Sequence, residues 1–382
     1  MKILQINASY KPAYIYGGPT MSVSKLSEEL IKAGCQVQVY TTTAKGPEEL
    51  PIPPNTKQIV DGVRVTYFKR ITKDHSHLSP ALLKALWRNA KQYDAIHIHA
   101  WWNMVSVLSA LIGQIKKVPV VISPRGTLSN YSFGYRKSLL KKLFHSVIGK
   151  SLLNHSYIHA TSPAEQQSLQ QIISPRQIFD IPNFVEIAPS MLMKTYDSSP
   201  LFKLLFFSRI DEKKGLDILL HALPLLKVPY HLTIAGDGDR QYVEVLKNII
   251  HYNNTEAHVS WIGFQHDNKF EVLAGQDLLV LPSQNENFGN VVIESLSAGT
   301  PVLISNGVGL ADYVSENNLG WVCEAKPESI AGMINEIAIN QKDKLQLMSD
   351  TAPTLIYADF DEGRLVQRYI GMYSQIITSP QL

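Results

Sequence analysis

LPSQNENFGNVVIESLSAGTPV, residues 281–302, predicts a passage from a strand through a loop into a helix and on to the next strand. The segment 277–281, in which Leu-Leu-Val-Leu follows Asp277, is typical of a buried parallel strand, and Pro282 breaks it into a polar loop. A helix is expected to begin near Asn290 and to run to Ala298. A helix that begins just past a parallel strand exposes free N–H groups at its start, and these favour an anion.

Two carboxylates flank the predicted start of this helix. Glu286 lies in the loop and Glu294 one turn into the helix, with seven residues between them. Taken singly, Glu294 fits a first-turn residue that complements the helix dipole, and Glu286 fits a solvated loop charge. Together with Asn287-Phe288-Gly289, the spacing resembles the E-x7-E signature of family 4 retaining glycosyltransferases, which have the GT-B fold.

That resemblance implies a role for each residue of the stretch. Glu294 would hold the ribose hydroxyls of a sugar nucleotide, and Glu286 would hold hydroxyls of the donor sugar. The backbone of the segment between them would help to bind the same donor, and its residues are Asn287, Phe288, Gly289, Asn290 and Val291.

The composition is that of a globular protein long enough for two domains. The chain has 382 residues, of which 45% are hydrophobic and 18% charged, and a net charge of +3 is too small to indicate a nucleic-acid partner. Cys35 and Cys323 fall in different halves and predict no disulfide framework, which suits a reducing compartment. The first strand is expected to begin at Lys2, so we expect no signal peptide, and no apolar run reaches membrane-spanning length. We therefore expect a cytoplasmic location.

The first half opens as a strand, a helix and a second strand. We expect strands at 2–8 and 37–40 around a helix at 20–33. The loop before the helix contains Gly17-Gly18 but no G-x-G-x-x-G, which argues against a nicotinamide enzyme. In the resembled family this loop packs near the donor diphosphate, where glycines allow a close approach. A flexible surface loop is the alternative.

Histidines and tryptophans gather at the end of a strand predicted at 93–99. His97 and His99 share one face of it without a neighbour at metal-ligand spacing, so we expect one core histidine and one at the strand's end near the acceptor. Trp101 and Trp102 follow directly, and they either line an acceptor groove or pack against the strand.

The segment 119–127 predicts a strand that runs into the turn Ser-Pro-Arg-Gly at 123–126. Many members of the resembled family have His before that Gly, where it points at the donor sugar and the acceptor. This chain has Arg125 there, and resembles the branch often seen in surface-polysaccharide assembly. Arg125 cannot act as a base, whereas its guanidinium suits a phosphate or an acidic acceptor.

Residues 135–152 predict a helix with an apolar stripe and only positive charges beside it. The stripe consists of Leu139, Leu140, Leu143, Phe144, Val147 and Ile148, and the charges are those of Arg136, Lys137, Lys141, Lys142 and Lys150. Such a helix either lies on an anionic bilayer, which would suit a lipid-linked acceptor, or is half-buried with a solvated face. The first alternative predicts a peripheral position at the inner face of the cytoplasmic membrane.

The second half begins after the unpatterned segment 185–200. A strand at 201–207 is followed by Arg209 and, five residues later, by Lys214 at the start of a helix. Two cations beside a helix start suit a diphosphate, although each alone would fit an ordinary surface charge. Their position matches the Arg…Lys-Gly pair that stabilises the departing diphosphate in the resembled family, which implies that role for Arg209 and Lys214.

Two glycine turns follow the next strands. Gly236 opens the segment Gly-Asp-Gly-Asp, whose Asp237 and Asp239 imitate a D-x-D metal motif. We expect a turn and a helix N-cap here, and no metal. Gly263 ends the following strand, whose backbone meets the nucleobase in the resembled family. The resemblance therefore places Gly236 and Gly263 in the donor site.

The alternation of strands and helices in both halves predicts an α/β protein with two parallel-sheet domains. We expect a Rossmann-like acceptor domain at 1–184, a linker at 185–200 and a Rossmann-like nucleotide-sugar domain at 201–358. A final helix at 359–382 should cross back to the first domain. This is the organisation of the GT-B fold, in which two doubly wound domains face one another across a cleft.

The resemblance, together with these residues, implies a retaining hexosyltransferase that needs neither a metal nor another cofactor. It would move a sugar from a UDP- or GDP-linked donor to a glycan or lipid-linked glycan, in assembly of a bacterial polysaccharide, lipopolysaccharide or capsule. The expected catalytic residues are Glu286, Arg209 and Lys214, and the expected acceptor-side residues are His99, Trp101 and Arg125. Two alternatives remain: a sugar-nucleotide epimerase of the same fold, and a non-catalytic scaffold subunit that binds a sugar nucleotide.

Overall fold

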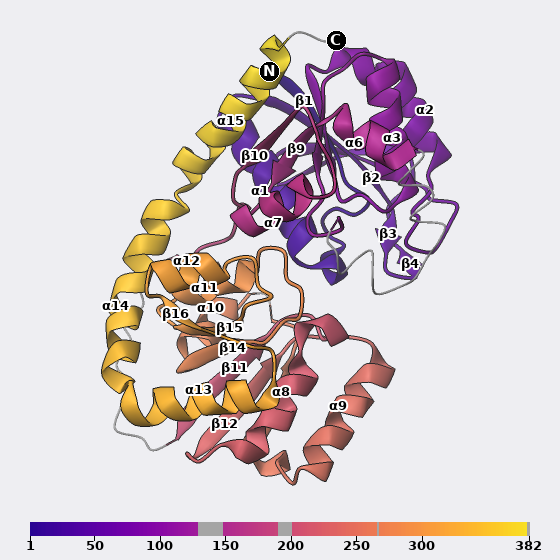
Figure 1. Cartoon of the computed structure of the whole chain (residues 1–382). Helices are drawn as coiled ribbons and strands as arrows, with labels where there is room; N and C mark the ends of the chain where they lie inside the picture. Colours follow the sequence, from indigo (N-terminus) through magenta and orange to yellow (C-terminus); the bar gives the residue numbers. More distant parts are fainter. Residues whose placement is uncertain (129–147, 190–200, 266, 380–382) are drawn as a thin grey trace. The chain divides into compact units, whose positions relative to one another are not determined.

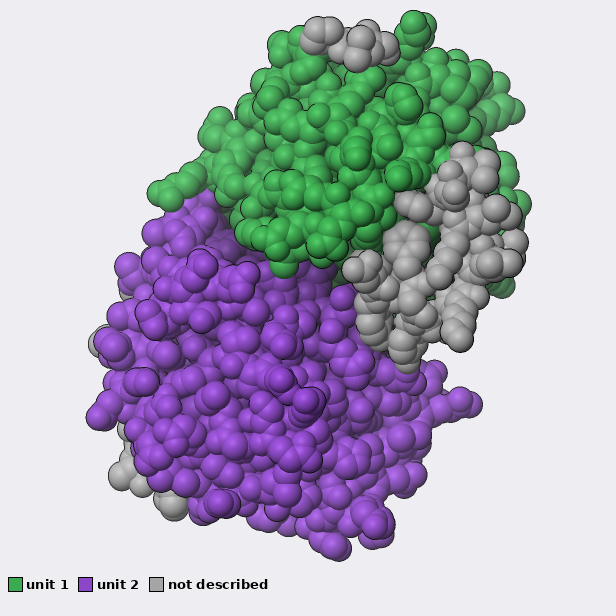
Figure 2. Space-filling model, in the orientation of Figure 1, with its two compact units in different colours: residues 1–184, 362–382 green, residues 185–361 purple. Residues whose placement is uncertain are grey.

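Strands and helices alternate along the chain and form two units (Figure 1). The computed structural model describes residues 1–128, 148–189, 201–265 and 267–379. Unit 1 consists of residues 1–184 and 362–382 and unit 2 of residues 185–361, coloured green and purple in Figure 2. The chain therefore leaves unit 1 once and returns to it near its end.

Unit 1 is built on an eight-stranded sheet with the order β10-β9-β8-β7-β1-β2-β6-β5. Its strands are β1 (Lys2–Ile6), β2 (Gln36–Thr42), β5 (Thr56–Val60), β6 (Val63–Phe68), β7 (Ala95–His99), β8 (Val120–Ser123), β9 (Tyr157–Ala160) and β10 (Gln177–Asp180). Neighbours are parallel except β5, which pairs antiparallel with β6 at the edge. A separate hairpin joins β3 (Ala44–Lys45) and β4 (Glu48–Glu49).

Unit 2 is built on a six-stranded, wholly parallel sheet with the order β13-β12-β11-β14-β15-β16. Its strands are β11 (Phe202–Phe207), β12 (Tyr230–Ala235), β13 (Val259–Gly263), β14 (Leu278–Leu281), β15 (Val302–Ser305) and β16 (Gly320–Cys323). The order reverses between β11 and β14, and in such sheets ligands bind outside the carboxyl ends of the strands at that point.

Helices connect the strands in both units. Unit 1 contains α1 (Gly18–Lys32), α2 (Pro80–Asn89), α3 (Met104–Ile115), α6 (Lys150–Asn154), α7 (Pro163–Gln170) and α15 (Glu362–Thr378). Unit 2 contains α8 (Leu216–Ala222), α9 (Arg240–Tyr252), α10 (Lys269–Ala274), α11 (Asn290–Ser297), α12 (Ala311–Glu316), α13 (Pro327–Asn340) and α14 (Lys342–Asp359). The helix α15, yellow in Figure 1, contacts α1 and β7. Of the helices in the described ranges, none has both the length and the hydrophobicity that a membrane crossing requires.

Both sheets are buried on two faces, as their apolar strands predict. In β1, Ile3 and Leu4 belong to different apolar clusters, and in β11 the same is true of Leu204 and Leu205. Successive side chains of a strand point to opposite faces, so each sheet separates two clusters. Parallel sheets occur in proteins with this double burial.

The sequence pattern predicts neither α3 nor α14. α14 carries Pro353 in its interior, a residue that ordinarily ends a helix. α3 buries Ser106 and Ser109 while Leu111 and Ile115 are exposed, so its apolar residues do not mark its buried face. The helix predicted at 135–152 lies mostly outside the described residues, and only its last part, from Ile148 on, is described.

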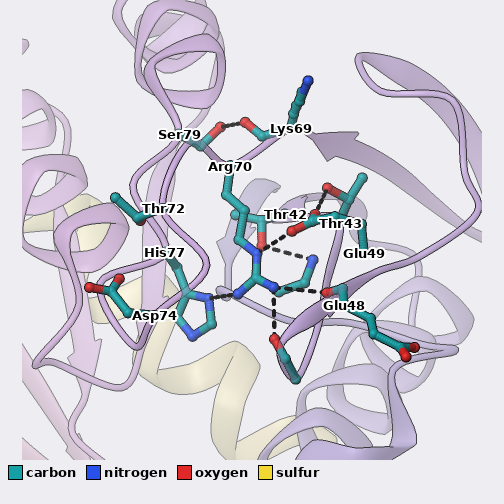
Figure 3. A network of polar contacts seen from close by, with 12 residues as sticks. Thr42, Thr43, Glu48, Glu49, Lys69, Arg70, Thr72, Asp74, His77 and Ser79 are labelled. Carbon is teal, nitrogen blue, oxygen red and sulfur yellow. Dashed lines mark hydrogen bonds and ion pairs between the residues drawn. The ribbon is translucent and has the colours of Figure 1, made fainter.

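A buried arginine ties the β3–β4 hairpin to the loop that precedes α2 (Figure 3). The Arg70 side chain is fully buried, and its Nε donates to the Glu49 carboxylate at 2.6 Å. Its Nη2 donates to the carbonyl oxygens of Gly46 and Glu48 at 2.7 and 2.8 Å, and its Nη1 lies 3.2 Å from Nδ1 of His77. Burial, reinforced by the Arg70 charge, lowers the pKa of His77 to about 4, so this imidazole is neutral and accepts. The guanidinium thus meets one carboxylate and three neutral acceptors.

In unit 2 the loop after β11 touches the loop after β14. A Cβ at Gly215 would lie 2.2 Å from the carbonyl oxygen of Pro282, so only glycine allows this approach. Gly215 also has a φ of +71°, in the left-handed region. The backbone N–H of Gln284 donates to the carbonyl oxygen of Lys213 at 2.9 Å. The two loops are thereby fixed against each other.

Replacing Arg70 by Gln should destabilise unit 1, because Glu49 would lose its cation and two carbonyl groups would lose their donors. We expect the free energy of unfolding to fall by about 3 kcal/mol and Tm to fall by roughly 6–12 °C. The control is Lys247→Gln, which removes an exposed pair with Glu244 and should cost less than about 0.5 kcal/mol. Calorimetry of both variants measures the difference, and equal losses would contradict a structural role for Arg70.

Replacing Gly215 by Ala should destabilise unit 2 by about 2 kcal/mol or more, because the added methyl group meets Pro282 and the left-handed φ is strained. The matched control is Gly332→Ala in α13, where no atom lies within 4 Å of an added Cβ. That change should stabilise the helix by up to about 1 kcal/mol. Denaturant unfolding compares the two, and a neutral Gly215→Ala would show that the loops separate without cost.

Candidate functional site

The candidate residues of unit 2 lie where the strands of its parallel sheet end. The loops that leave β11, β12 and β13 are bonded to one another: Ser208 N–H donates to the Ala235 carbonyl oxygen at 3.1 Å, and Gly236 N–H to that of Gly263 at 2.8 Å. A Cβ at Gly236 would lie 1.9 Å from the Ser208 carbonyl oxygen. Gly236 and Gly263 therefore contribute backbone, and not side chains, to this edge. The next residues fit the predicted turn, since Asp239 caps α9 through the amides of Gln241 and Tyr242.

Lys214 and Glu286 form an ion pair at this edge. Nζ of Lys214 contacts Oε2 of Glu286, and the two side chains are only 14% and 18% exposed. The Glu286 backbone is fixed on both sides, since its N–H donates to the Gly307 carbonyl oxygen at 2.9 Å and its own carbonyl accepts from Gly309 N–H at 2.8 Å. The sequence predicts Lys214 and Glu286 from separate motifs, and the fold brings them into contact.

Other charges surround this ion pair. Arg209 is exposed and lies 3.3 Å from the Asp211 carboxylate. Burial, reinforced by Lys213 and Arg209, lowers the pKa of Lys214, while the Glu286 carboxylate in contact with it favours the ammonium form. A charged group with little water around it attracts an anion more strongly than it would in bulk solvent.

The helix α11 begins at Asn290, four residues after Glu286. Its N-cap is Gly289, with a φ of +92°, a residue that has no side chain with which to cap the helix. A Cβ at Gly289 would lie 3.5 Å from Cγ of Glu286, so the Glu286 side chain lies against the start of the helix. Phe288 is buried and packs on Phe360, which anchors the loop. The other candidate residues of the stretch are partly buried, namely Asn287, Asn290 and Val291.

Glu294 is held by a lysine that no motif in the sequence marks. Nζ of Lys269, at the start of α10, lies 2.9 Å from Oε1 of Glu294 and 2.8 Å from Oε2 of Glu186. Burial alone would lower the pKa of Lys269, but the two carboxylates outweigh it and raise the pKa. A helix, a strand and a loop separate Lys269 from Glu294 along the chain, so no local pattern could have shown the pair.

In unit 1, Gly17 and Gly18 form the start of α1. Gly17 is the N-cap with a φ of +64°, no side chain caps the helix, and Pro19 lies in its first turn. The space around a Cβ at Gly17 is open, since no atom lies within 4 Å of it. The start of α1 is therefore accessible.

A chain of hydrogen bonds runs through the buried histidines of unit 1. Burial lowers the pKa of His159 to about 3, so its ring is neutral. Nε2 of His159 lies 2.8 Å from the Ile181 carbonyl oxygen, which can only accept, so this nitrogen carries the proton. Nδ1 of His159 therefore accepts from Oγ of Ser123 at 2.6 Å. Ser123 in turn accepts from Nε2 of His97 at 2.6 Å, and Nδ1 of His97 accepts from the Tyr373 hydroxyl at 2.7 Å.

The same chain continues to Arg125. The Gln5 amide nitrogen donates to the Tyr373 hydroxyl at 3.1 Å, and the Gln5 oxygen accepts from Nε2 of His99 at 2.6 Å. Nδ1 of His99 then accepts from Nε of Arg125 at 3.3 Å. Burial holds the pKa values of His97 and His99 well below the usual range, so both rings are neutral.

Arg125 itself lies in the turn after β8, with a φ of +52°. Its Nη1 donates to Oδ1 of Asn183 at 2.6 Å and to Oγ of Ser22 at 2.9 Å. The next N–H, that of Gly126, donates to the Glu165 carboxylate at 2.7 Å. No motif in the sequence marks Ser22, whose importance arises only from its contact with Arg125, and no local pattern could have shown that Asn183 contacts Arg125.

The other candidate residues of unit 1 are in its interior. His99 is fully buried and accepts a hydrogen bond from Arg125. Trp101 is also fully buried in the apolar core, so packing, and not an acceptor groove, describes its side chain. Among the residues that the structure describes, no group of three or more His, Cys, Asp or Glu side chains is placed to hold a metal ion.

The chain matches the sequence models of two protein families. Residues 16–188 match the model described as Glycosyltransferase Family 4, and residues 197–353 match the one described as Glycosyl transferases group 1. The glycogen synthase of Mycobacterium tuberculosis is 25% identical over 386 aligned residues, which cover 94% of this chain and 91% of the synthase.

Two solved structures share the fold over their whole length. The Anabaena protein Alr3699/HepE, in complex with UDP and glucose, is 22% identical with a TM-score of 0.74, and the match covers 98% of this chain and 100% of that one. A sucrose-phosphate synthase from Thermosynechococcus elongatus is 19% identical with a TM-score of 0.78, with full coverage of both chains. The two parallel-sheet units thus have the GT-B fold, and the chain belongs to the group 1 glycosyltransferases of family 4.

Proposed function

We propose that this enzyme transfers a hexose-type sugar from a UDP- or GDP-linked donor to a hydroxyl group of a glycan or lipid-linked glycan. The transfer would retain the anomeric configuration, need no metal, and serve assembly of a bacterial polysaccharide, lipopolysaccharide or capsule. The observation that carries the proposal is the contact between Lys214 and Glu286 beside the start of α11.

The donor would be bound by charges and by backbone groups of unit 2. Arg209, Lys214 and the positive dipole end of α11 would supply positive charge for the diphosphate. Glu286, with its backbone held from both sides, orients hydroxyls of the sugar, and Glu294, held by Lys269, binds the ribose hydroxyls. Backbone alone contributes at Gly236 and Gly263.

The reaction requires stabilisation of the departing diphosphate. As the bond between the anomeric carbon and the diphosphate oxygen breaks, its electron pair leaves with the diphosphate. The acceptor hydroxyl oxygen forms the new bond, and its proton passes to the departing phosphate oxygen. Fixed cations with few waters around them stabilise the growing negative charge without reorganising, which is the largest single contribution in many enzymes.

The relatives suggest which donor to test first. Structures of Anabaena HepE contain UDP and UDP-glucose. Because that protein is only 22% identical to this chain, its ligands guide the choice of experiment and leave the sugar open.

A nucleoside diphosphate that fills the site should stabilise the protein against heat. At ~100 times its dissociation constant a ligand adds about 2.7 kcal/mol, which corresponds to a rise in Tm of roughly 5–10 °C. Thermal shifts with UDP, GDP, ADP, TDP and CMP, each with and without EDTA, should show stabilisation by UDP or GDP that EDTA does not change. A flat response to all five would contradict the donor site.

Lys214→Met should lower turnover by roughly 10²- to 10³-fold, because a fixed cation next to the leaving group is lost. It should also destabilise unit 2, because Glu286 is left unpaired. Lys326→Met, which removes an exposed cation, is the control and should change neither quantity.

The double variant Lys214→Met/Glu286→Gln separates the two effects. With both charges removed, stability should recover while turnover stays low, since both groups act on the donor. Turnover that recovers together with stability would show that the pair serves the fold alone. Product analysis of the same reactions, with and without an acceptor, distinguishes transfer from epimerisation of the donor.

A further inference from the structure

Arg125 carries a positive charge in unit 1 that no opposite charge contacts. Its three hydrogen-bond acceptors are neutral: the His99 ring, the Ser22 hydroxyl and the Asn183 amide oxygen. Within the described ranges, no carboxylate oxygen lies within 4.0 Å of its nitrogens, and its Nη2 has no hydrogen-bond partner. The residue as a whole is only partly exposed, and burial is the main influence on the pKa of its guanidinium, which it lowers.

Arg70, in the same unit, is a guanidinium with a structural role, and its partners can be compared with those of Arg125. That side chain is fully buried, and it has the Glu49 carboxylate at 2.6 Å and two backbone carbonyl groups at 2.7 and 2.8 Å. A charge taken out of water without such a partner costs several kcal/mol, which proteins avoid unless a ligand supplies the partner. The contrast between Arg70 and Arg125 therefore indicates a missing anion.

The surroundings of Arg125 fix its position without neutralising it. His99 cannot take up charge, because it is fully buried and both of its nitrogens are engaged. Ser22 lies one turn inside α1 and donates to the Gly18 carbonyl oxygen, which leaves its lone pairs for Arg125. The positive end of α1 has the same sign as the guanidinium, so the helix adds to the demand for an anion.

One carboxylate of unit 1 acts on Arg125 from a longer distance. Burial lowers the pKa of Arg125. The Glu165 charge acts in the opposite direction, but the pKa remains below its usual value. Its two oxygens, however, are already bonded to the N–H of Gly126 at 2.7 Å and to the N–H of Thr161 at 2.8 Å. The segment 129–147 that follows Arg125 in the sequence contains no Asp or Glu.

We propose that Arg125, with the start of α1, binds an anionic group of the acceptor, which is a carboxylate or a phosphate. The proposal rests on the proposed function, in which the donor diphosphate already has its own cations in unit 2. A carboxylate would make the acceptor an acidic sugar, and a phosphate would make it a phosphorylated or lipid-phosphate-linked one. Both present the planar guanidinium with two oxygens for a forked pair of hydrogen bonds.

The test uses three probes on the full-length protein saturated with the nucleoside diphosphate that stabilises it most. Isothermal titration calorimetry at low salt compares D-glucuronate and inorganic phosphate with D-glucose, which carries no charge. At least one anion should bind roughly ten-fold tighter than glucose, and Arg125→Gln should abolish the preference. Arg125→Lys keeps the charge but loses the forked pair of hydrogen bonds, so it should retain part of the preference for the anion. This variant replaces Arg125→Gln in the test if Arg125→Gln does not fold.

The affinity for the nucleoside diphosphate shows whether Arg125 contacts the acceptor or the donor. Arg125→Gln should change it by less than about two-fold, because the two sites have separate cations. A loss of ten-fold or more would mean that Arg125 meets the donor diphosphate, which would overturn the acceptor assignment. Three probes that bind the wild type equally would overturn the anion site, whereas anion selection in a protein that binds no nucleotide would overturn the proposed function instead.

Stability gives an independent readout. Without anions, Arg125→Gln should unfold within about 2 °C of the wild type or above it, because a charge without a contacting counterion is removed. Arg70→Gln, measured in parallel, should unfold at a clearly lower temperature. A drop of equal size for both variants would assign Arg125 to the structure alone.

Discussion

A charge withdrawn from water must be met by an opposite charge or by a full set of hydrogen bonds, and this constraint orders the polar interior of both units. Lys214 meets Glu286 and Lys269 meets Glu294, so each glutamate of the seven-residue spacing is held by its own lysine. Groups that are fixed before a ligand arrives need not be reorganised when it binds. The same lysines that make burial of the glutamates tolerable therefore also prepare the site.

Parallel sheets explain why these groups meet at one edge. Every strand of unit 2 runs in the same direction, so the loops after β11, β12 and β14 leave the sheet together. Those loops can then pack backbone against backbone only where a side chain is missing, as at Gly215 and Gly236. In unit 1 the corresponding edge is organised by neutral histidines, which pass a fixed hydrogen-bond direction from one residue to the next. Uncharged rings can be buried in this way, whereas imidazolium groups could not.

The sequence was sufficient for the strands and for the principal charges of unit 2. Periodicity and glycine turns mark every strand of the unit 2 sheet, and the family resemblance pointed to Lys214 and Glu286, which the structure brings into contact. Long-range partners could not be predicted, because nothing local connects Lys269 with Glu294 or Asn183 with Arg125. Trp101 shows a second limit, since a tryptophan after a strand has the same local pattern whether it packs or binds.

The sequence order of the units has a consequence for biosynthesis. Two tyrosines of α15 complete the interior of unit 1: Tyr373 serves His97 and Gln5, and Tyr369 donates to the Pro182 carbonyl oxygen at 3.1 Å. Residues 185–361, which form unit 2, leave the ribosome before this helix does. Domains generally fold as they emerge from the ribosome. The first part of unit 1 is synthesised early, but the hydrogen bonds between its buried histidines and α15 can form only after α15 has been synthesised. A change in α15 that removes these hydroxyl groups would therefore disturb the hydrogen bonds within the sheet of unit 1.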